Sequence, residues 1–174
     1  TLPSWIAGLL DSGKPEWLIK VQRSEDLRDV APRVIRPDLL MTENGFALTE
    51  LDAVPGGIGI TGWLSKRYGA EGHKLLGGPA GMVEGFRSLM PRGGEVLISE
   101  ESVDYRPEME WLVNALNGAG EEPWGISSAE TFKDGNSSGG LYRFFELFDW
   151  EAIPALLSLS RSRNLTPPCK PHFE

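Results

Sequence analysis

The stretch GEVLISEESVDYRPEMEWLVNALNGAGEEPWGISSAETF, residues 94–132, decides the fold class. It opens with a short apolar run that ends in acids, which predicts a buried strand. Residues 106–120 have the spacing of an amphipathic helix, and its apolar positions share one face: Met109, Leu112, Val113 and Leu116. The run that begins at Pro123 predicts the next strand. A strand, a helix and a strand in this order predict a βαβ unit and therefore a partly parallel sheet.

Upstream of this unit, residues 33–52 predict an antiparallel hairpin. Two β-like runs, RVIRPDLLMT and FALTELD, are joined by Glu43-Asn44-Gly45. Asn-Gly between apolar runs is the strongest short signal for a hairpin turn. Pro37 lacks an amide donor, so it belongs at an edge or a bulge. We therefore expect an α/β protein whose mixed sheet combines an antiparallel hairpin with a Rossmann-like βαβ unit.

Glycine and proline divide the chain into four regions. Residues 1–32 predict a helical lead-in, and residues 33–60 contain the hairpin. Residues 61–140 predict an α/β domain around the βαβ unit. Residues 141–174 predict an aromatic strand, a helix and an extended tail.

Composition limits the classes of partner. The chain has 174 residues and a formal net charge of −8. An acidic domain repels a phosphate backbone, so we expect no general binding of nucleic acid. No apolar run approaches the ~20 residues that cross a bilayer, and no signal peptide opens the sequence, so we expect no membrane partner.

The single cysteine, Cys169, limits the chemistry further. Together with His73 and His172 it provides too few ligands for a Cys/His zinc site. One thiol cannot form an internal disulfide, which favours a cytoplasmic location. Neither histidine has a sequence context that pairs with Cys169 for nucleophilic catalysis.

The segment Gly57-Ile-Gly59-Ile-Thr-Gly62 matches the G-x-G-x-x-G pattern and precedes a helix predicted from about Gly62 to Tyr68. A dinucleotide site also needs an acid at the end of the next strand, about 20 residues on. Residues 75–81, LLGGPAG, supply neither the strand nor the acid. The glycines are therefore expected to form a turn that leads the chain off the hairpin. A nicotinamide or flavin site of an oxidoreductase is the weaker alternative.

Charged residues alternate along both strands of the predicted hairpin. Arg36 and Asp38 point to one face of the first strand, and Glu50 and Asp52 share a face of the second. Pairing through the Asn-Gly turn brings Asp38 near Glu50. Three carboxylates are ligands that Mg²⁺ accepts, and a guanidinium donates to phosphate. A solvated hairpin face, with Arg36 simply paired to an acid, is the alternative interpretation.

The strings Arg36-Pro-Asp38 and Glu50-Leu-Asp52-Ala-Val-Pro, separated by Asn-Gly, resemble the metal-binding hairpin of the circularly permuted ATP-grasp ligases of the glutathionylspermidine synthase type. That family has Arg-x-Asp on one strand and Glu-x-Asn on the next. A second match is LYRFFELFDWE, residues 141–151, which is similar to the family's aromatic strand ending in Trp-Glu before a helix. The resemblance spans roughly residues 33–155 and implies a pre-ATP-grasp domain next to the hairpin.

The resemblance also implies a function. Asp38, Glu50 and Asp52 would hold Mg²⁺ and the phosphates of ATP. Arg36 would stabilise the transferring phosphoryl group or the acyl phosphate. Ligases of this family activate a carboxylate with ATP and then let an amine displace phosphate, so the implied substrates are a small-molecule or peptide carboxylate and an amine.

Two departures from the family's pattern change what is expected of this chain. Asp52 stands where the family has Asn, which adds a negative charge. The lysines that contact the nucleotide in that family lie downstream, in a segment these 174 residues do not contain. We therefore expect the chain to be inactive alone and to need the remainder of its ATP-grasp domain.

A different class of function is also compatible with the sequence. The same elements suit a non-catalytic α/β module that binds a peptide, a small ligand or another domain. Ser99, Glu100 and Glu101 follow the first strand of the βαβ unit, where ligands of parallel sheets often bind; a solvated strand end is the alternative interpretation.

Overall fold

The computed structural model describes residues 3–133, 139–160 and 164–169. It confirms an α/β fold, in which antiparallel and parallel pairing occupy separate sheets. The last residues of the predicted tail lie outside the described residues.

The parallel sheet has four strands: β3 (Gly94–Ile98), β4 (Trp124–Ser128), β5 (Gly140–Phe144) and β6 (Leu165–Thr166). Their spatial order is β4-β3-β5-β6, and every pairing is parallel. Helix α6 (Arg106–Ala119) connects β3 to β4, which confirms the predicted βαβ unit. The chain then crosses back to place β5 on the other side of β3. The order of the strands therefore reverses between β3 and β5.

Alternating side chains of the strands build a core on each face of this sheet. Val96 and Ile98 of β3 pack with the apolar face of α6, whereas Leu97 between them belongs to the opposite core. Tyr142 and Phe144 of β5 likewise face α6, and Phe145 faces the other side. This period of two is what a pleated strand covered on both faces requires.

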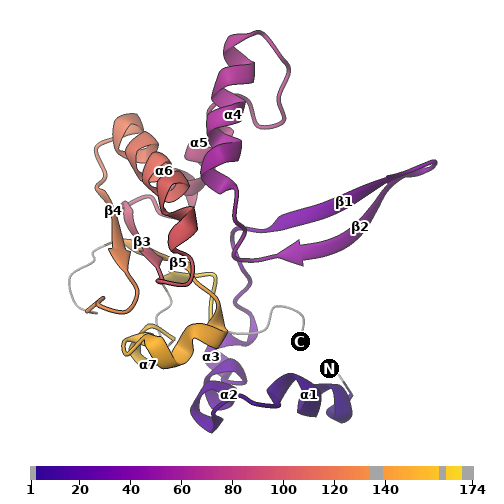
Figure 1. Cartoon of the computed structure of the whole chain (residues 1–174), viewed down its shortest axis with the longest axis vertical. Coiled ribbons are helices and arrows are strands. Elements are labelled where there is room, and N and C mark those ends of the chain that lie inside the picture. Colours follow the sequence, from indigo (N-terminus) through magenta and orange to yellow (C-terminus); the bar gives the residue numbers. More distant parts are fainter. Residues whose placement is uncertain (1–2, 134–138, 161–163, 170–174) are drawn as a thin grey trace.

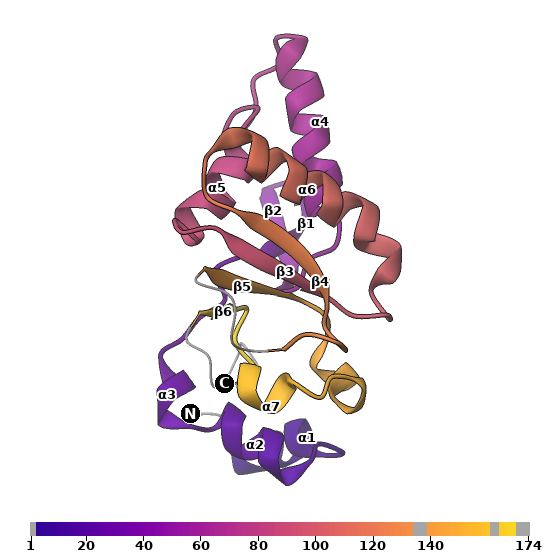
Figure 2. The same ribbon diagram turned by 90° about the vertical axis from the view of Figure 1, so that its left-hand side faces the viewer.

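Helices cover both faces of the parallel sheet, as Figure 2 shows. Helices α5 (Gly81–Leu89) and α6 lie on one face, and α7 (Leu156–Leu159) lies on the other. The predicted helical lead-in lies beyond α7 and consists of α1 (Ser4–Asp11), α2 (Glu16–Gln22) and α3 (Glu25–Arg28). Two short 3-10 helices complete the fold, η1 (Val103–Tyr105) and η2 (Leu147–Ala152).

The predicted hairpin is present and projects from the domain as an arm (Figure 1). It consists of β1 (Arg36–Thr42) and β2 (Gly45–Asp52), which pair antiparallel from Thr42↔Gly45 to Arg36↔Asp52. The two turn residues are Glu43 and Asn44, one position earlier than the Asn-Gly pair. Gly45 follows them with a φ of +124°, a conformation that favours glycine.

The predicted start of the helix after the hairpin and the predicted conformation of the tail both need correction. Helix α4 (Ile58–Ala70) begins earlier than the Gly62 start predicted from the sequence, so most of the glycine pattern lies inside the helix. The tail was expected to be extended without a closing element. Instead, β6 pairs with β5 as a fourth strand, and residues 167–169 after it are buried.

Arg143 on β5 ties the tail to the sheet. Its side chain is 1% exposed, and its Nε donates to the carbonyl oxygen of Pro167 at 3.2 Å. Its Nη1 donates to the carbonyl of Phe145. A buried charge is stable only where such hydrogen bonds satisfy it. The bond to Pro167 therefore both stabilises the buried guanidinium and fixes the tail against β5.

No helix among residues 3–133, 139–160 and 164–169 has the length and apolar character to cross a bilayer.

Cys169 provides a test of the tail's position. Its thiol is buried in the core beside α7, and burial raises its pKa to about 11. At pH 8 we expect iodoacetamide to alkylate the native protein about two orders of magnitude more slowly than the urea-unfolded chain, because the thiolate is the reactive form. Equal rates in the two states would show that the tail does not pack here.

Candidate functional site

The register of the arm places the four predicted site residues on facing positions. Arg36 lies opposite Asp52, and Asp38 lies opposite Glu50. This confirms the expected proximity of Asp38 and Glu50. The register shifts directly beyond this pair, between Asp38 and Leu39. At this shift Thr49 faces no residue of β1 in the strand register. Its Oγ1 donates a hydrogen bond to the carbonyl of Asp38 at 3.0 Å.

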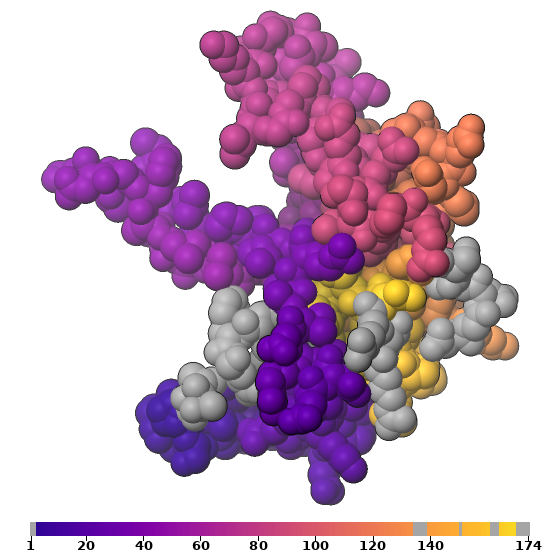
Figure 3. Space-filling view, turned by 180° about the vertical axis from the view of Figure 1, so that it is seen from behind, coloured from indigo at the N-terminus to yellow at the C-terminus, as the bar shows by residue number. Residues whose placement is uncertain are grey.

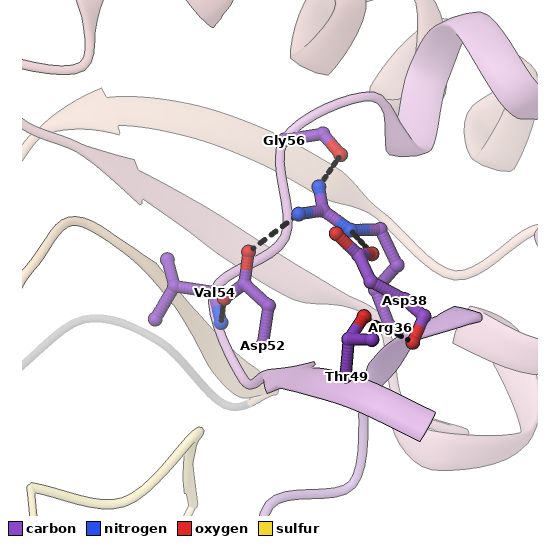
Figure 4. Close-up of polar contacts among 6 residues, drawn as sticks. All are labelled: Arg36, Asp38, Thr49, Asp52, Val54 and Gly56. Atoms are coloured by element: carbon purple, nitrogen blue, oxygen red, sulfur yellow. Dashed lines mark hydrogen bonds and ion pairs between the residues drawn. The ribbon is translucent and has the colours of Figure 1, made fainter. Parts of the chain in front are cut away.

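Arg36 is the centre of this group, and Figure 4 shows its three contacts. Its Nε donates to Oδ1 of Asp38 at 3.0 Å, and its Nη2 lies 3.3 Å from Oδ2 of Asp52. Its Nη1 donates to the carbonyl of Gly56 at 3.1 Å. The hydrogen bond to Asp38 raises the pKa of Arg36 above its ordinary value, and the charges of Asp38, Asp52 and Glu50 add to the effect. The guanidinium is therefore permanently charged.

These contacts also fix the base of the arm. Gly56 lies between the arm and α4, so Arg36 joins the first strand to the segment that leaves the second. Oδ1 of Asp52 accepts the amide of Val54 at 2.8 Å, which closes the turn out of β2. Arg36 and Asp38 are both more than 40% exposed, so the ion pair alone contributes about 0–1 kcal/mol.

The carboxylates match Mg²⁺ in chemistry but are not gathered as a metal centre. Among the described residues, no group of three His, Cys, Asp or Glu side chains is placed to hold a metal ion. Asp38 and Asp52 turn to Arg36, and Glu50 is exposed across from Asp38. Hard oxygen donors on neighbouring strand positions are the set that Mg²⁺ accepts. Exposed side chains change rotamer on the ps–ns scale, so the backbone register permits a shared ligand that the present rotamers do not form.

The glycine pattern has a structural role in this fold. The backbone amides at the start of α4 are already bound by the carboxylate of Glu108 on α6. This carboxylate accepts the amide of Gly57 at 3.0 Å, that of Gly59 at 3.0 Å and that of Ile60 at 3.3 Å. A carboxylate here satisfies amides that have no partner inside the helix and complements the helix dipole. In a dinucleotide site a pyrophosphate would take this position.

The glycines also allow α4 to lie directly against α6. A Cβ added at Gly59 would lie 2.1 Å from the carbonyl oxygen of Glu108, and one at Gly62 would lie 2.7 Å from the ring of Trp111. A side chain at Gly59 would require the backbone of α6 to move, and one at Gly62 would require the ring of Trp111 to move. These glycines are therefore required for the close packing of α4 on α6. The sequence pattern alone does not distinguish this role from that of a phosphate-binding loop.

A second polar group lies at the carboxyl ends of the parallel strands. The hydroxyl of Ser99, directly after β3, donates to Oδ2 of Asp149 at 3.1 Å. Burial raises the pKa of Asp149, as do the charges of Glu101 and Glu130, against the opposing hydrogen bond from Ser99. Ser99 and its neighbours were predicted from the sequence, whereas Asp149 was missed. The signal was available, because residues that follow β5 reach the same edge as residues that follow β3.

Glu146 links this edge to the base of the arm. Burial raises its pKa, Arg143 opposes the shift, and the charges of Asp52 and Asp149 raise it further. Asp52 is thus within electrostatic reach of the carboxyl end of β5. The arm and the point where the strand order reverses are neighbours in the fold.

No protein-family model, curated protein or solved structure matches this chain.

The role of the glycines can be measured by substitution. Gly59→Ala should lower the free energy of unfolding by about 1–3 kcal/mol, because the new methyl group overlaps the backbone of Glu108. Gly118→Ala in α6 is the matched control, since nothing lies within 4 Å of its added Cβ. The control should be as stable as the native protein or slightly more stable. A Gly59→Ala variant with an unchanged urea midpoint would contradict the close packing of α4 and α6.

Proposed function

We propose that this chain forms the metal- and phosphate-binding side of an ATP-dependent carboxylate–amine ligase. The observation that carries the proposal is the paired register of the arm, which sets Arg36 opposite Asp52 and Asp38 opposite Glu50. One permanent cation and three carboxylates on adjacent positions suit phosphoryl transfer. That reaction relies on positioning and on charge around the phosphate oxygens more than on covalent chemistry by the protein.

The proposed roles follow from the side chains. Asp38, Glu50 and Asp52 would hold Mg²⁺, and bound Mg²⁺-ATP would supply the phosphoryl group for an acyl phosphate. Arg36 would donate charge-assisted hydrogen bonds to the negative charge that develops there. Its raised pKa keeps those donors charged at every working pH. Ion pairing to Asp38 and Asp52 holds the guanidinium at the base of the arm before any ligand arrives.

The activity is proposed for the chain together with the nucleotide-binding segment of its ATP-grasp domain. In the resembled family the lysines that contact ATP belong to that segment, so the isolated chain is expected to be inactive. A ligase of this kind uses cytoplasmic ATP, and the single buried thiol of Cys169 suits a reducing compartment. We accordingly propose a cytoplasmic location.

Metal binding can be tested on the isolated chain. Mn²⁺ should broaden the amide NMR signals of the arm's base, because its ligands lie on β1 and β2. Glu50→Gln should weaken Mn²⁺ binding about tenfold or more by removing a carboxylate ligand. Glu43→Gln at the tip of the arm is the matched control and should bind as the native chain does. Equal Mn²⁺ affinity of the two variants would refute the metal role of Glu50.

The proposed catalysis is tested on the chain together with the nucleotide-binding segment that the proposal assigns to it. ATP-dependent phosphate release should appear with the correct pair from a panel of carboxylates and amines. Glu50→Ala should reduce the release about a hundredfold or more, a loss of roughly 3 kcal/mol of transition-state stabilisation. Unchanged turnover in Glu50→Ala would overturn the proposed site.

A non-catalytic binding module is the second candidate, and one observation favours it. The outer part of the arm exposes large apolar side chains, including Met41 at 85% and Phe46 at 71%. Exposed apolar patches of this kind mark interaction surfaces. Absence of both Mn²⁺ binding and phosphate release would favour this candidate over the ligase. The weaker oxidoreductase alternative loses support, since Glu108 takes the amides a dinucleotide would need.

A further inference from the structure

A groove of about 410 Å³ lies between the base of the arm, the start of α4 and one face of α5. Figure 3 shows the hollow between the projecting arm and the lobe that contains α4 and α5. Its walls come from residues 33–37, from residues 55–58 with Thr61, and from residues of α5. Pockets for small ligands begin at about 300 Å³, so this groove has the size of a site for a small molecule.

The wall formed by α5 is unusually open. Gly81 and Gly85 are one helical turn apart on the face that lines the groove, and nothing lies within 4 Å of a Cβ added at either position. The apolar side chains of Ile58, Met82 and Phe86 also line the groove. A ligand can therefore lie against the backbone of the helix, with apolar contact on both sides.

The charged residues among the described residues that line the groove are Arg33 and Arg36. Arg36 is already paired with Asp38 and Asp52, so Arg33 is the arginine that can meet an anionic group of a ligand. A ligand that fits must combine an apolar body with an anionic group. Arg36 lines the groove and belongs to the proposed phosphate site, so the arginine end of the groove adjoins the place where activation would occur.

We infer that this groove binds the acid substrate and that this substrate is a monocarboxylic acid with an apolar body. The inference rests on the proposed ligase function and assigns the substrate class of the same site. The carboxylate lies at the arginine end, and the apolar body lies along Gly81 and Gly85. The acidic edge near Ser99 and Asp149 has the wrong charge for this ligand.

Sodium octanoate is a suitable probe for the isolated chain in the presence of Mg²⁺. Saturable changes in the amide NMR signals of Gly57, Gly81 and Gly85 are expected, because these residues line the groove. Octylamine and octanamide have the same apolar body without the carboxylate and should bind at least tenfold more weakly. Equal binding of the three probes would overturn the assignment to an acid, and changes that do not saturate would overturn the site.

A steric variant tests the location. Gly85→Leu adds a side chain to the groove wall at a position where an added Cβ meets nothing within 4 Å, and it should weaken octanoate binding at least tenfold. Gly118→Leu, at another open helical glycine, is the matched control and should bind octanoate normally. Unfolding curves of both variants confirm that they fold. Unchanged octanoate affinity in a folded Gly85→Leu variant would place the acid elsewhere.

The two proposals fail in different ways. Mn²⁺ binding at the arm without octanoate binding would retain the metal site and reject the groove. Saturable octanoate binding without Mn²⁺ binding would retain the groove as an acid-binding site and reject the ligase.

Discussion

The carboxylate of Glu108 at the start of α4 is the interaction on which the rest of this structure depends. It accepts amides of Gly57, Gly59 and Ile60 and so joins α4 to the helix of the βαβ unit. The segment that leaves the arm ends at this point. Tyr105, just before α6, packs against Gly56 and stacks edge-to-face on Phe144 at 5.5 Å between ring centroids. Glu108 and Tyr105 therefore fix the position of the arm relative to the core of the domain.

From this junction the proposed site is assembled in two steps. Strand register sets Arg36 across from Asp52, and the bond from Arg36 to the Gly56 carbonyl holds that pair against the domain. The acidic carboxyl edge of the parallel sheet lies near enough for the Asp52 charge to raise the pKa of Glu146. The base of the arm also lines the groove that holds Arg33 and Arg36.

Sequence reasoning succeeded where a local pattern has one physical outcome. A turn between two apolar runs fixes a hairpin, and the period of two places Arg36 and Asp38 on one face. The pairing of Asp38 with Glu50 depends on the register shift beyond Asp38, because the register at the turn alone would set Asp38 opposite Thr49. Amphipathic spacing identified α6 and with it the βαβ unit. The start of α4 was wrong because glycines suit a loop and a close helix contact equally well. Only the position of Glu108, far along the chain, decides between them. Strand β6 was missed because two residues carry no periodicity, and the groove because its walls come from three separate segments.

The exposed outer part of the arm has a consequence for how substitutions are tolerated. Met41 and Phe46 bury little surface within this chain, so replacing them with polar residues changes the folding free energy only slightly. Selection for a stable fold therefore constrains Met41 and Phe46 very little. At Gly59 or Leu112 the opposite holds, since each is enclosed by its own fold. A library screened for folding alone would accept polar residues along the outer arm and would leave any requirement for apolar residues there undetected.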